Sequence, residues 1–382
     1  MRRLKVIIFT AAYGGGHKSV ANALRGYFNC RYANKVSVEI IDFMKQFAPV
    51  ADKSLYYLYK QTIKRVPSAY RFFFDVTDKL FGRSSGKIDL LRSLQVRRLW
   101  RKISRPGRKK AREFLAKARP DIIISTYPVP TQVLPDFKKS LNFYIATVIT
   151  DFGVHSQWIN RENDLYFVAS DEVKKFLISK GIPAGRVKVT GIPIRPVFSR
   201  PVNNINVRKK FGLSSKFTVL VMSGEYGLGK IKKLCEELIH LPVQLVIICG
   251  RNERLLKKIA PLARRYRNIK PFGFVEEVNE LMKVSDLLVG KAGGITVSEA
   301  QASGLPMIIY CPIPGQEMYN VDYLVNHGAA FFSRDEKDVA QKVEFLLRHP
   351  ERLRQMQVRT KRIGKPLSTG NVCKEIMKYR YC

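Results

Sequence analysis

Short and almost continuous runs of apolar residues recur along the whole chain, and they constrain its fold more than any other feature. They alternate with segments of helical periodicity. A strand that is apolar on both faces has to be buried on both faces. The sequence therefore predicts an α/β protein with a parallel sheet in each half. The runs lie at 4–9, 121–125, 143–149, 165–169, 218–222, 244–248, 286–289 and 306–310.

The length and composition are sufficient for two domains of ordinary size. The chain has 382 residues, and 46% of them are hydrophobic, which is ample for two cores. The segment 191–201 contains three prolines, which break any helix, and a polar stretch follows it. We place the domain boundary there. The N-terminal domain is predicted to span 1–196, and the C-terminal domain 197–367.

A glycine turn in the second half of the chain has the form of an anion-binding site. The apolar run 286–289 leads into Gly293 and Gly294, and a helix is predicted from about 296 to 303. Glycines let the backbone approach an anion closely, and a helix N-terminus offers unpaired N–H groups and a positive dipole end. The turn is shaped for a nucleotide diphosphate. A capping box formed by Thr296 and Glu299 is the structural alternative.

A second glycine turn near the start of the chain favours the ligand interpretation. The run 4–9 ends in this turn, and helical spacing resumes at 19–28. Strand, glycine loop and helix form the opening unit of an α/β nucleotide fold, although neither the P-loop order nor a proper Gly-x-Gly-x-x-Gly pattern is present. His17 follows directly, and its ring could take a proton from an incoming hydroxyl; contact with solvent alone is the other interpretation. The glycines are Gly14, Gly15 and Gly16.

Charge is the other extreme feature of the sequence. The net charge is +37, and the segment 53–119 holds twenty basic and four acidic residues interleaved with aromatic side chains. This composition favours an amphipathic surface on an anionic membrane. Nucleic-acid binding, or core aromatics with solvated charges, are the alternatives, and no nucleic-acid-binding motif is present. The predicted membrane contacts are Tyr56, Tyr57, Lys60, Lys64, Arg65, Phe72, Phe73, Phe74, Arg97, Arg98, Trp100 and Arg101.

The sequence gives no sign of a metal site or of a membrane span. The six cysteines lack paired metal spacing and are expected to be reduced thiols. No Asp-x-Asp occurs, and the acidic pairs 276–277 and 335–336 are interpreted as helix starts. We expect no signal peptide and no apolar stretch of ~18 residues, so the chain is predicted to be soluble or peripheral. Leaving-group charge would then be stabilised by helix dipoles, amides and basic side chains without a metal.

Several motifs in a fixed order resemble one family. The chain is similar, nearly from end to end, to glycosyltransferase family 28, in the branch of monogalactosyldiacylglycerol synthases and processive diacylglycerol glucosyltransferases. Each motif is weak alone, and their combination and order carry the resemblance. The motifs lie at 14–17, 150–158, 191–196, 273–275, 290–300, 314–317 and 320.

The resemblance implies a GT-B fold: two Rossmann-like domains facing across a cleft, with the acceptor on the N-terminal side and a UDP-sugar on the C-terminal side. The helix 368–382 would pack back on the first domain. The family is metal-independent and inverting, so no cofactor is expected. The catalytic residues would be His17, Asp151 and His155, any of which is a candidate base. The implied donor-binding residues are Gly224, Gly227, Gly229, Phe274, Val275, Gly293, Gly294, Thr296, Glu299, Gly315, Gln316, Glu317 and Asn320.

In this assignment Glu299 would hold the ribose, backbone at 274–275 would read the uracil, and Gln316 and Glu317 would bind the sugar hydroxyls. One departure from the family pattern is Glu225, whose negative charge would oppose a diphosphate. For Asp151 and His155, the alternative is a cap and a packing residue.

The predicted function is transfer of a hexose from UDP-glucose or UDP-galactose to the 3-hydroxyl of diacylglycerol, by a peripheral enzyme on the cytoplasmic face of the cell membrane. Partners would be the lipid acceptor, the anionic membrane and the UDP-sugar, with no nucleic acid. A family-28 N-acetylglucosaminyltransferase acting on a lipid-linked peptidoglycan precursor is one alternative, and a nucleic-acid-binding protein with a degenerate GT-B fold is another. The choice of hexose and the number of sugars added stay open.

Overall fold

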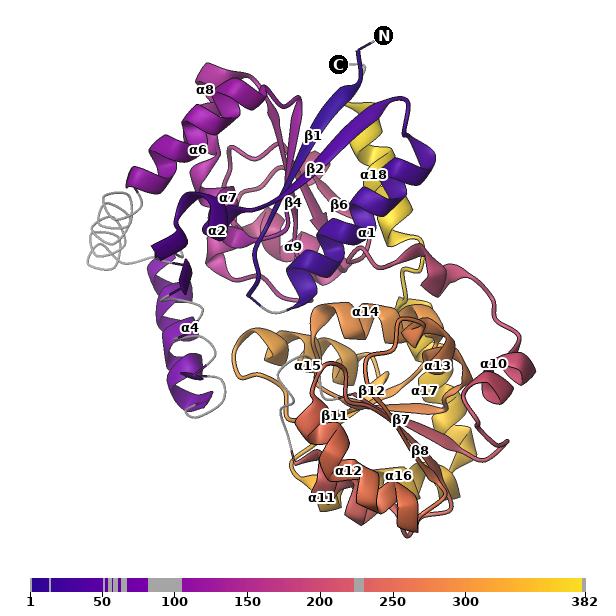
Figure 1. Cartoon of the computed structure of the whole chain (residues 1–382). Helices are drawn as coiled ribbons and strands as arrows, with labels where there is room; N and C mark the ends of the chain where they lie inside the picture. The colour runs from indigo at the N-terminus through magenta and orange to yellow at the C-terminus, as the bar shows by residue number, and fades with distance from the viewer. Residues whose placement is uncertain are drawn as a thin grey trace. The chain divides into compact units, whose positions relative to one another are not determined.

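The chain folds into two compact units, each built around its own sheet (Figure 1). The computed structural model describes residues 2–13, 15–50, 52–53, 57, 61–62, 67–81, 105–222 and 230–379. The first unit comprises Met1–Arg195, Pro314–Gln316 and Leu367–Cys382. The second comprises Pro196–Ile313 and Glu317–Pro366.

The first unit contains a six-stranded sheet in which every neighbouring pair of strands is parallel. Its order is β2-β1-β3-β4-β5-β6. Side chains alternate between the two faces of a strand. Ile7 and Phe9 lie in a core with Phe43 and Leu115, while Ile8 is equally buried between them. The strands are β1 (Leu4–Thr10), β2 (Val36–Asp42), β3 (Ile122–Ser125), β4 (Tyr144–Val148), β5 (Leu165–Val168) and β6 (Val187–Val189).

Helices cover this sheet, and the last helix of the chain belongs to the same unit. Helix α18 (Ser368–Lys378) packs along α1 (Gly15–Arg31), as the yellow and indigo ribbons of Figure 1 show. Gly370 faces Tyr27 of α1, and a Cβ there would lie 2.9 Å from the Tyr27 hydroxyl, so a larger residue would displace that side chain. The other helices are α2 (Phe43–Phe47), α4 (Pro67–Phe81), α6 (Arg105–Ala118), α7 (Pro128–Val133), α8 (Pro135–Leu141), α9 (Asp171–Ser179), η1 (Ser156–Trp158) and η2 (Ala184–Arg186).

The second unit repeats this architecture. Its six parallel strands have the order β12-β11-β10-β7-β8-β9. The strands are β7 (Thr218–Met222), β8 (Gln244–Ile248), β9 (Ile269–Phe272), β10 (Leu287–Gly290), β11 (Met307–Tyr310) and β12 (Ala330–Ser333). The helices are η3 (Pro196–Ser199), α10 (Asn204–Lys210), α11 (Ile231–Leu238), α12 (Glu253–Arg265), α13 (Val278–Val284), α14 (Gly294–Ser303), α15 (Gln316–Asn326), α16 (Glu336–Arg348) and α17 (Pro350–Ile363).

The prediction of an α/β chain with two parallel sheets is confirmed. The eight apolar runs coincide with the interior strands of the two sheets. The acidic pairs also lie at helix starts as predicted: Glu277 is the N-cap residue of α13, although its side chain forms no capping bond, and Asp335 accepts a hydrogen bond from the backbone N–H of Asp338 at the start of α16.

Candidate functional site

In each unit, one candidate segment follows a strand at which the strand order reverses. The first strand of each unit lies inside its sheet, so the chain builds outward in both directions from it. In open parallel sheets, ligands bind beyond the carboxyl ends of the strands at this reversal. It falls between β1 and β3 in the first unit and between β7 and β10 in the second. His17 follows β1, and the loop 291–293 follows β10.

His17 lies in the first turn of α1 and is held from several directions. Its Nδ1 atom is 3.3 Å from the hydroxyl of Thr150, which follows β4. The ring contacts Tyr127 edge-on at 5.4 Å between centroids and lies 6.2 Å from the ring of Trp158. The Thr126 hydroxyl donates to the backbone carbonyl of His17 at 3.2 Å. These contacts fix both the backbone and the plane of the imidazole.

Burial sets the protonation state of His17. Because a charged imidazolium loses hydration in this surrounding, its pKa is lowered to about 4. The ring is therefore neutral at pH 7. In the tautomer with the proton on Nδ1, Thr150 accepts that proton and Nε2 carries the lone pair. No residue in the described part of the chain forms a hydrogen bond with Nε2, so this nitrogen can accept a proton.

His155 has a different environment, although it was predicted as an equivalent candidate. Its Nδ1 accepts the backbone N–H of Gln157 at 3.1 Å, so the ring proton lies on Nε2 in the neutral form. Nε2 lies 3.1 Å from the Thr77 hydroxyl and 3.3 Å from the Phe74 carbonyl, both on α4. Burial lowers its pKa as well. Both nitrogens of His155 are therefore bonded: Nε2 joins the ring to α4, and Nδ1 joins it to the η1 turn.

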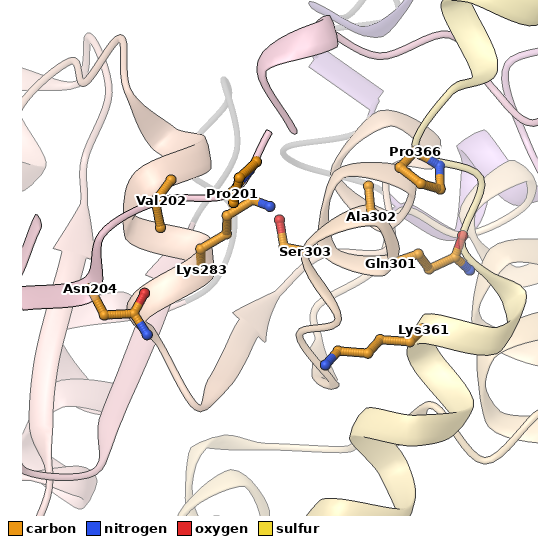
Figure 2. A pocket seen from close by; sticks show the side chains of 9 residues that line it. All are labelled: Pro201, Val202, Asn204, Lys283, Gln301, Ala302, Ser303, Lys361 and Pro366. Carbon is orange, nitrogen blue, oxygen red and sulfur yellow. The ribbon is translucent and has the colours of Figure 1, made fainter. Parts of the chain in front are cut away.

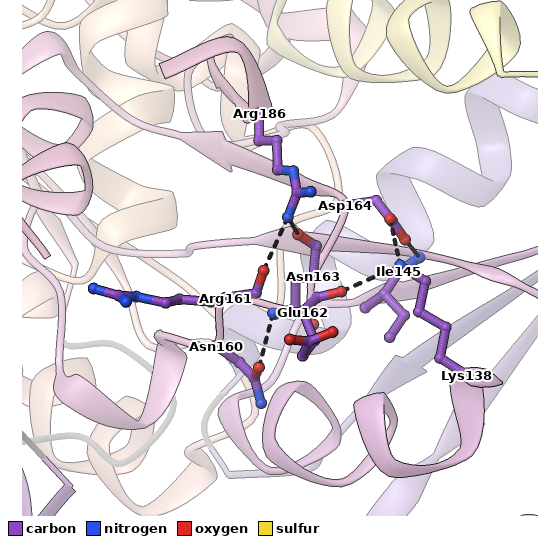
Figure 3. Close-up of polar contacts among 8 residues, drawn as sticks. All are labelled: Lys138, Ile145, Asn160, Arg161, Glu162, Asn163, Asp164 and Arg186. Atoms are coloured by element: carbon purple, nitrogen blue, oxygen red, sulfur yellow. Dashed lines mark hydrogen bonds and ion pairs between the residues drawn. The ribbon is translucent and has the colours of Figure 1, made fainter. Parts of the chain in front are cut away.

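The segment that carries His155 is anchored at Ser156, Gln157 and Ile159. Asp78 of α4 accepts the backbone N–H of Ser156 at 2.6 Å, and Gln132 donates to the carbonyls of Gln157 and Ile159. Asp151, also on this segment, is half-buried. The following turn is held by a polar network (Figure 3).

In that network Asp164 accepts from the backbone N–H of Ile145 at 2.8 Å and pairs with Lys138 at 2.5 Å. Arg186 donates to the carbonyl of Arg161 at 2.9 Å. The loop between β4 and β5 is thereby bonded to α8, to β4 and to η2. These bonds help to hold Thr150 and Trp158 beside His17.

In the second unit, α14 begins at Gly294, two residues earlier than predicted. Gly293 is its N-cap, and the first backbone hydrogen bond of the helix runs from Val297 to Gly293. Thr296 therefore lies inside the first turn and does not cap the helix, so the capping-box alternative is wrong. Val297 is the first residue of α14 whose N–H has a partner within the helix. The preceding N–H groups, those of Gly294, Ile295 and Thr296, can therefore donate hydrogen bonds to an anion.

Side chains of α15 fix the loop that precedes α14. Asn320, fully buried, donates to the Ala292 carbonyl at 2.7 Å. Glu317, 3% exposed, accepts the backbone N–H of Ile313 at 2.7 Å and pairs with Lys291 at 3.2 Å. A buried carboxylate needs such partners. The predicted role of Glu317 in binding sugar hydroxyls stays a prediction; its observed contacts are with the loop 291–293 and Ile313.

The remaining predicted donor residues have varied environments. Phe274 is 65% exposed, and the guanidinium of Arg251 lies over its ring at 5.1 Å. Val275 and Glu299 are half-buried. Gly315 has a positive φ of 89°, which favours glycine, and Gln316 is the first residue of α15.

The structure describes only part of the predicted membrane surface. Tyr57 is 66% exposed and Phe72 is 72% exposed. Phe74, predicted to contact lipid, packs against His155 with 4.7 Å between ring centroids. The predicted residues outside the described backbone are Gly14, Tyr56, Lys60, Lys64, Arg65, Arg97, Arg98, Trp100, Arg101, Gly224, Gly227 and Gly229, and the side chain of Phe73 is likewise not described.

Sequence reasoning assigned no role to Thr126, Tyr127, Thr150 or Lys291. Their position directly after β3, β4 and β10 is the signal that could have identified them, since loops at the carboxyl ends of parallel strands carry the functional groups. Within the described ranges, no group of three or more His, Cys, Asp or Glu side chains is arranged to hold a metal ion. No helix among these residues combines the length and apolar character needed to cross a bilayer.

Two family models match the chain. Residues 17–194 match the model for monogalactosyldiacylglycerol (MGDG) synthase, and residues 221–367 match the glycosyltransferase family 28 C-terminal domain. A processive diacylglycerol beta-glucosyltransferase of Bacillus mycoides is 36% identical over 379 residues, which cover 98% of this chain and 93% of the relative. A protein of the same name from Bacillus pumilus is 34% identical over 380 residues, with 98% and 94% covered.

Solved structures share the fold at lower identity. MurG of Acinetobacter baumannii superposes with a TM-score of 0.59 and 15% identity, covering 99% of this chain and all of that one. The MnaA–UDP co-structure from S. aureus gives 0.62 and 13%, covering 99% and 97%. The two α/β units are therefore those of a GT-B fold, as predicted. The chain belongs to glycosyltransferase family 28, in the branch of the monogalactosyldiacylglycerol synthases and processive diacylglycerol glucosyltransferases.

Proposed function

We propose that the protein transfers a hexose from a UDP-sugar to the 3-hydroxyl of diacylglycerol. The observation that carries the proposal is the 36% identity, over 98% of this chain, to an enzyme named for glucose transfer to diacylglycerol. Two further observations support it. Structures with the same fold were solved with UDP, and each unit has candidate residues at its strand reversal.

The second unit would hold the donor. The diphosphate accepts hydrogen bonds from the first-turn amides of α14, whose dipole favours negative charge there. Glu299 on the same helix binds the ribose hydroxyls. The contacts of Asn320 and Glu317 with the loop 291–293 and Ile313 support this role, because amides aimed at a developing charge have to be fixed in advance.

The first unit would activate the acceptor. His17 Nε2 removes the proton from the 3-hydroxyl as its oxygen forms a bond to the anomeric carbon of the sugar. The bond between that carbon and the diphosphate oxygen breaks, and UDP leaves with its electron pair. One displacement inverts the anomeric centre. The neutral state of His17 at pH 7 and its contact with Thr150 support this assignment over His155, whose two nitrogens are already bonded.

We propose that this reaction needs no metal ion. The charge on departing UDP would be stabilised by the α14 amides and by basic side chains, as in other sites where fixed dipoles face a developing anion. The acceptor would be reached at the cytoplasmic face of the membrane. Exposed Tyr57 and Phe72 and the net charge of +16 over 53–119 suit an interface of lipid phosphates and acyl chains.

Incubation of the purified protein with vesicles that contain diacylglycerol tests the proposal. UDP-glucose and UDP-galactose are supplied separately, with EDTA or with added Mg²⁺, and the lipids are identified by mass spectrometry. We expect hexosyl-diacylglycerol from one donor at equal rates with and without EDTA. A product only from a lipid-linked peptidoglycan precursor and UDP-N-acetylglucosamine would reject the proposed acceptor and donor.

A further inference from the structure

Charged side chains lie at both ends of α14. At the C-terminal end, Lys283 and Lys361 line a cavity of about 450 Å³ (Figure 2). Lys361 passes over Gly304, the C-cap residue of this helix, since a Cβ on that glycine would lie 2.6 Å from Lys361 Cε. The negative end of the helix dipole favours cations there. By the same rule, the N-terminal end of α14 favours an anion.

The protein itself places an anion at that N-terminal end, the carboxylate of Glu317. Its Oε1 atom lies 3.7 Å from the position that a Cβ on Gly293, the N-cap residue of α14, would take. Glu317 is buried, and solvent screens a buried charge poorly. An unbalanced carboxylate here would repel the proposed diphosphate and compete with it for the positive end of the helix dipole. A donor site on α14 therefore requires a cation that balances Glu317.

Lys291 supplies this cation. Its Nζ atom lies 3.2 Å from Glu317 Oε1, and its side chain is only 12% exposed. The other carboxylate oxygen, Oε2, accepts the backbone N–H of Ile313 at 2.7 Å. Within the described ranges, Lys291 is the only cationic residue that pairs with Glu317. Lys291 directly follows β10 and lies two residues before Gly293, so the cation and the α14 amides belong to one loop.

We propose that Lys291 is a positioning residue for the donor: by pairing with Glu317, it cancels the negative charge beside the start of α14 and leaves the first-turn amides to the diphosphate of UDP. The inference rests on the proposed function, since it assumes a nucleoside diphosphate on α14. It adds a specific task for Lys291, which acts on the ligand through Glu317 rather than by touching it.

Equilibrium titrations of the full chain with UDP, and with uridine as a ligand without phosphates, test the proposal. In Lys291→Met the carboxylate of Glu317 loses its cation, and we expect UDP to bind at least tenfold more weakly, because like charges then repel in a partly desolvated site. Uridine affinity should stay within about twofold, because uridine carries no charge. Lys361→Met is the matched control, since it removes a positive charge from the opposite end of the same helix, and it should change neither affinity.

The double variant Lys291→Met, Glu317→Gln distinguishes an effect through Glu317 from a direct contact of Lys291 with the phosphates. It also removes the unpaired buried carboxylate that could prevent Lys291→Met from folding, so the test does not depend on the single variant. With no charge left to cancel, UDP should bind within about threefold of the wild type. Glu317→Gln alone should bind UDP at least as tightly as the wild type, because Lys291 keeps its charge.

Three results would overturn the proposal. UDP affinity of Lys291→Met within about twofold of the wild type would show that the charge of Glu317 does not reach the ligand. Equal weakening in Lys291→Met and in the double variant would show that Lys291 acts without Glu317. Equal losses of UDP and uridine affinity would show a purely structural effect. Failure of the wild-type chain to bind UDP would instead reject the proposed donor site, and this inference with it.

Discussion

The starts of α1 and α14 both follow a glycine turn at a strand reversal, but they are held in different ways. The loop before α14 is fixed through its backbone, because Asn320 bonds the Ala292 carbonyl and Glu317 the Ile313 amide. At the start of α1 the side chain of His17 is fixed as well, by the Thr150 hydroxyl and the rings of Tyr127 and Trp158.

This difference indicates what each site can do. A fixed backbone with open first-turn amides suits the binding of an anion whose position does not change. A fixed neutral imidazole suits proton transfer, because the base has to point at one hydroxyl. We therefore expect mutations in the first unit to change turnover and mutations in the second to change donor affinity.

His17→Ala should have the largest effect. Loss of a general base reduces rates by about 100-fold to 10,000-fold, so turnover should fall at least 100-fold while UDP affinity stays within about twofold. Initial rates and UDP titrations on one preparation measure both quantities. Turnover near that of the wild type would exclude His17 as the base.

Asn320→Ala should have the next largest effect, and it should act mainly on UDP affinity rather than on turnover. The buried Ala292 carbonyl loses its partner, which costs about 1–3 kcal/mol, and the loop before α14 loses its anchor. UDP should bind about tenfold more weakly, with a smaller change in kcat. Asn326→Ala, at the exposed end of the same helix, is the matched control. A fall in kcat at unchanged UDP affinity would contradict the assignment of roles.

Thr150→Val tests whether the hydroxyl orients the His17 ring. Valine has nearly the same shape but cannot accept from Nδ1, so we expect turnover to fall by about tenfold, the ordinary value of one hydrogen bond to a reacting group. UDP affinity should not change, and Thr150→Ser should restore most of the rate. A structural role alone would lower thermal stability and UDP affinity together.

The pH dependence should distinguish His17 from an ordinary histidine. Since its pKa is lowered to about 4, kcat/KM should stay level from pH 7 down to about 5 and decline only as the pH approaches 4. A decline centred near pH 6.5 would show that the base is another group.

A change of pH should also have a smaller effect, on the free energy of unfolding. The unfolded chain binds a proton at His17 near pH 6.5, whereas the folded chain does so near pH 4. The free energy of unfolding should therefore decrease as the pH falls through this window. His155 acts in the same direction, because its pKa is also lowered. Denaturant titrations at pH 7 and 5 should show a smaller decrease in His17→Asn than in the wild type.

The sequence predicted the interior of each sheet and missed its edges. The four strands β2, β6, β9 and β12 are the outermost strands of the two sheets, and the apolar runs did not include them. An edge strand is covered on fewer sides, so its residues are less uniformly apolar. In β2, for example, Ser37 and Glu39 alternate with more buried neighbours. A rule based on continuous apolar runs cannot find such strands.

The candidate site was predictable in its position but not in its internal division of roles. His17 and His155 could not be distinguished in the sequence, because the bonds that occupy His155 come from Phe74 and Thr77, far away along the chain. Similarly, the buried pair of Glu317 with Lys291 depends on how α15 packs beside the loop before α14. Contacts of this kind are set by tertiary packing and leave no local pattern.

Hydrogen exchange with and without UDP tests whether the backbone amides at the start of α14 bind the diphosphate. Peptides covering 291–298 should exchange more slowly when UDP is bound, and the same region of Asn320→Ala should need about tenfold more UDP for equal protection. If UDP binds and slows exchange elsewhere while 291–298 is unchanged, the diphosphate does not lie on α14 and the proposed donor site is wrong.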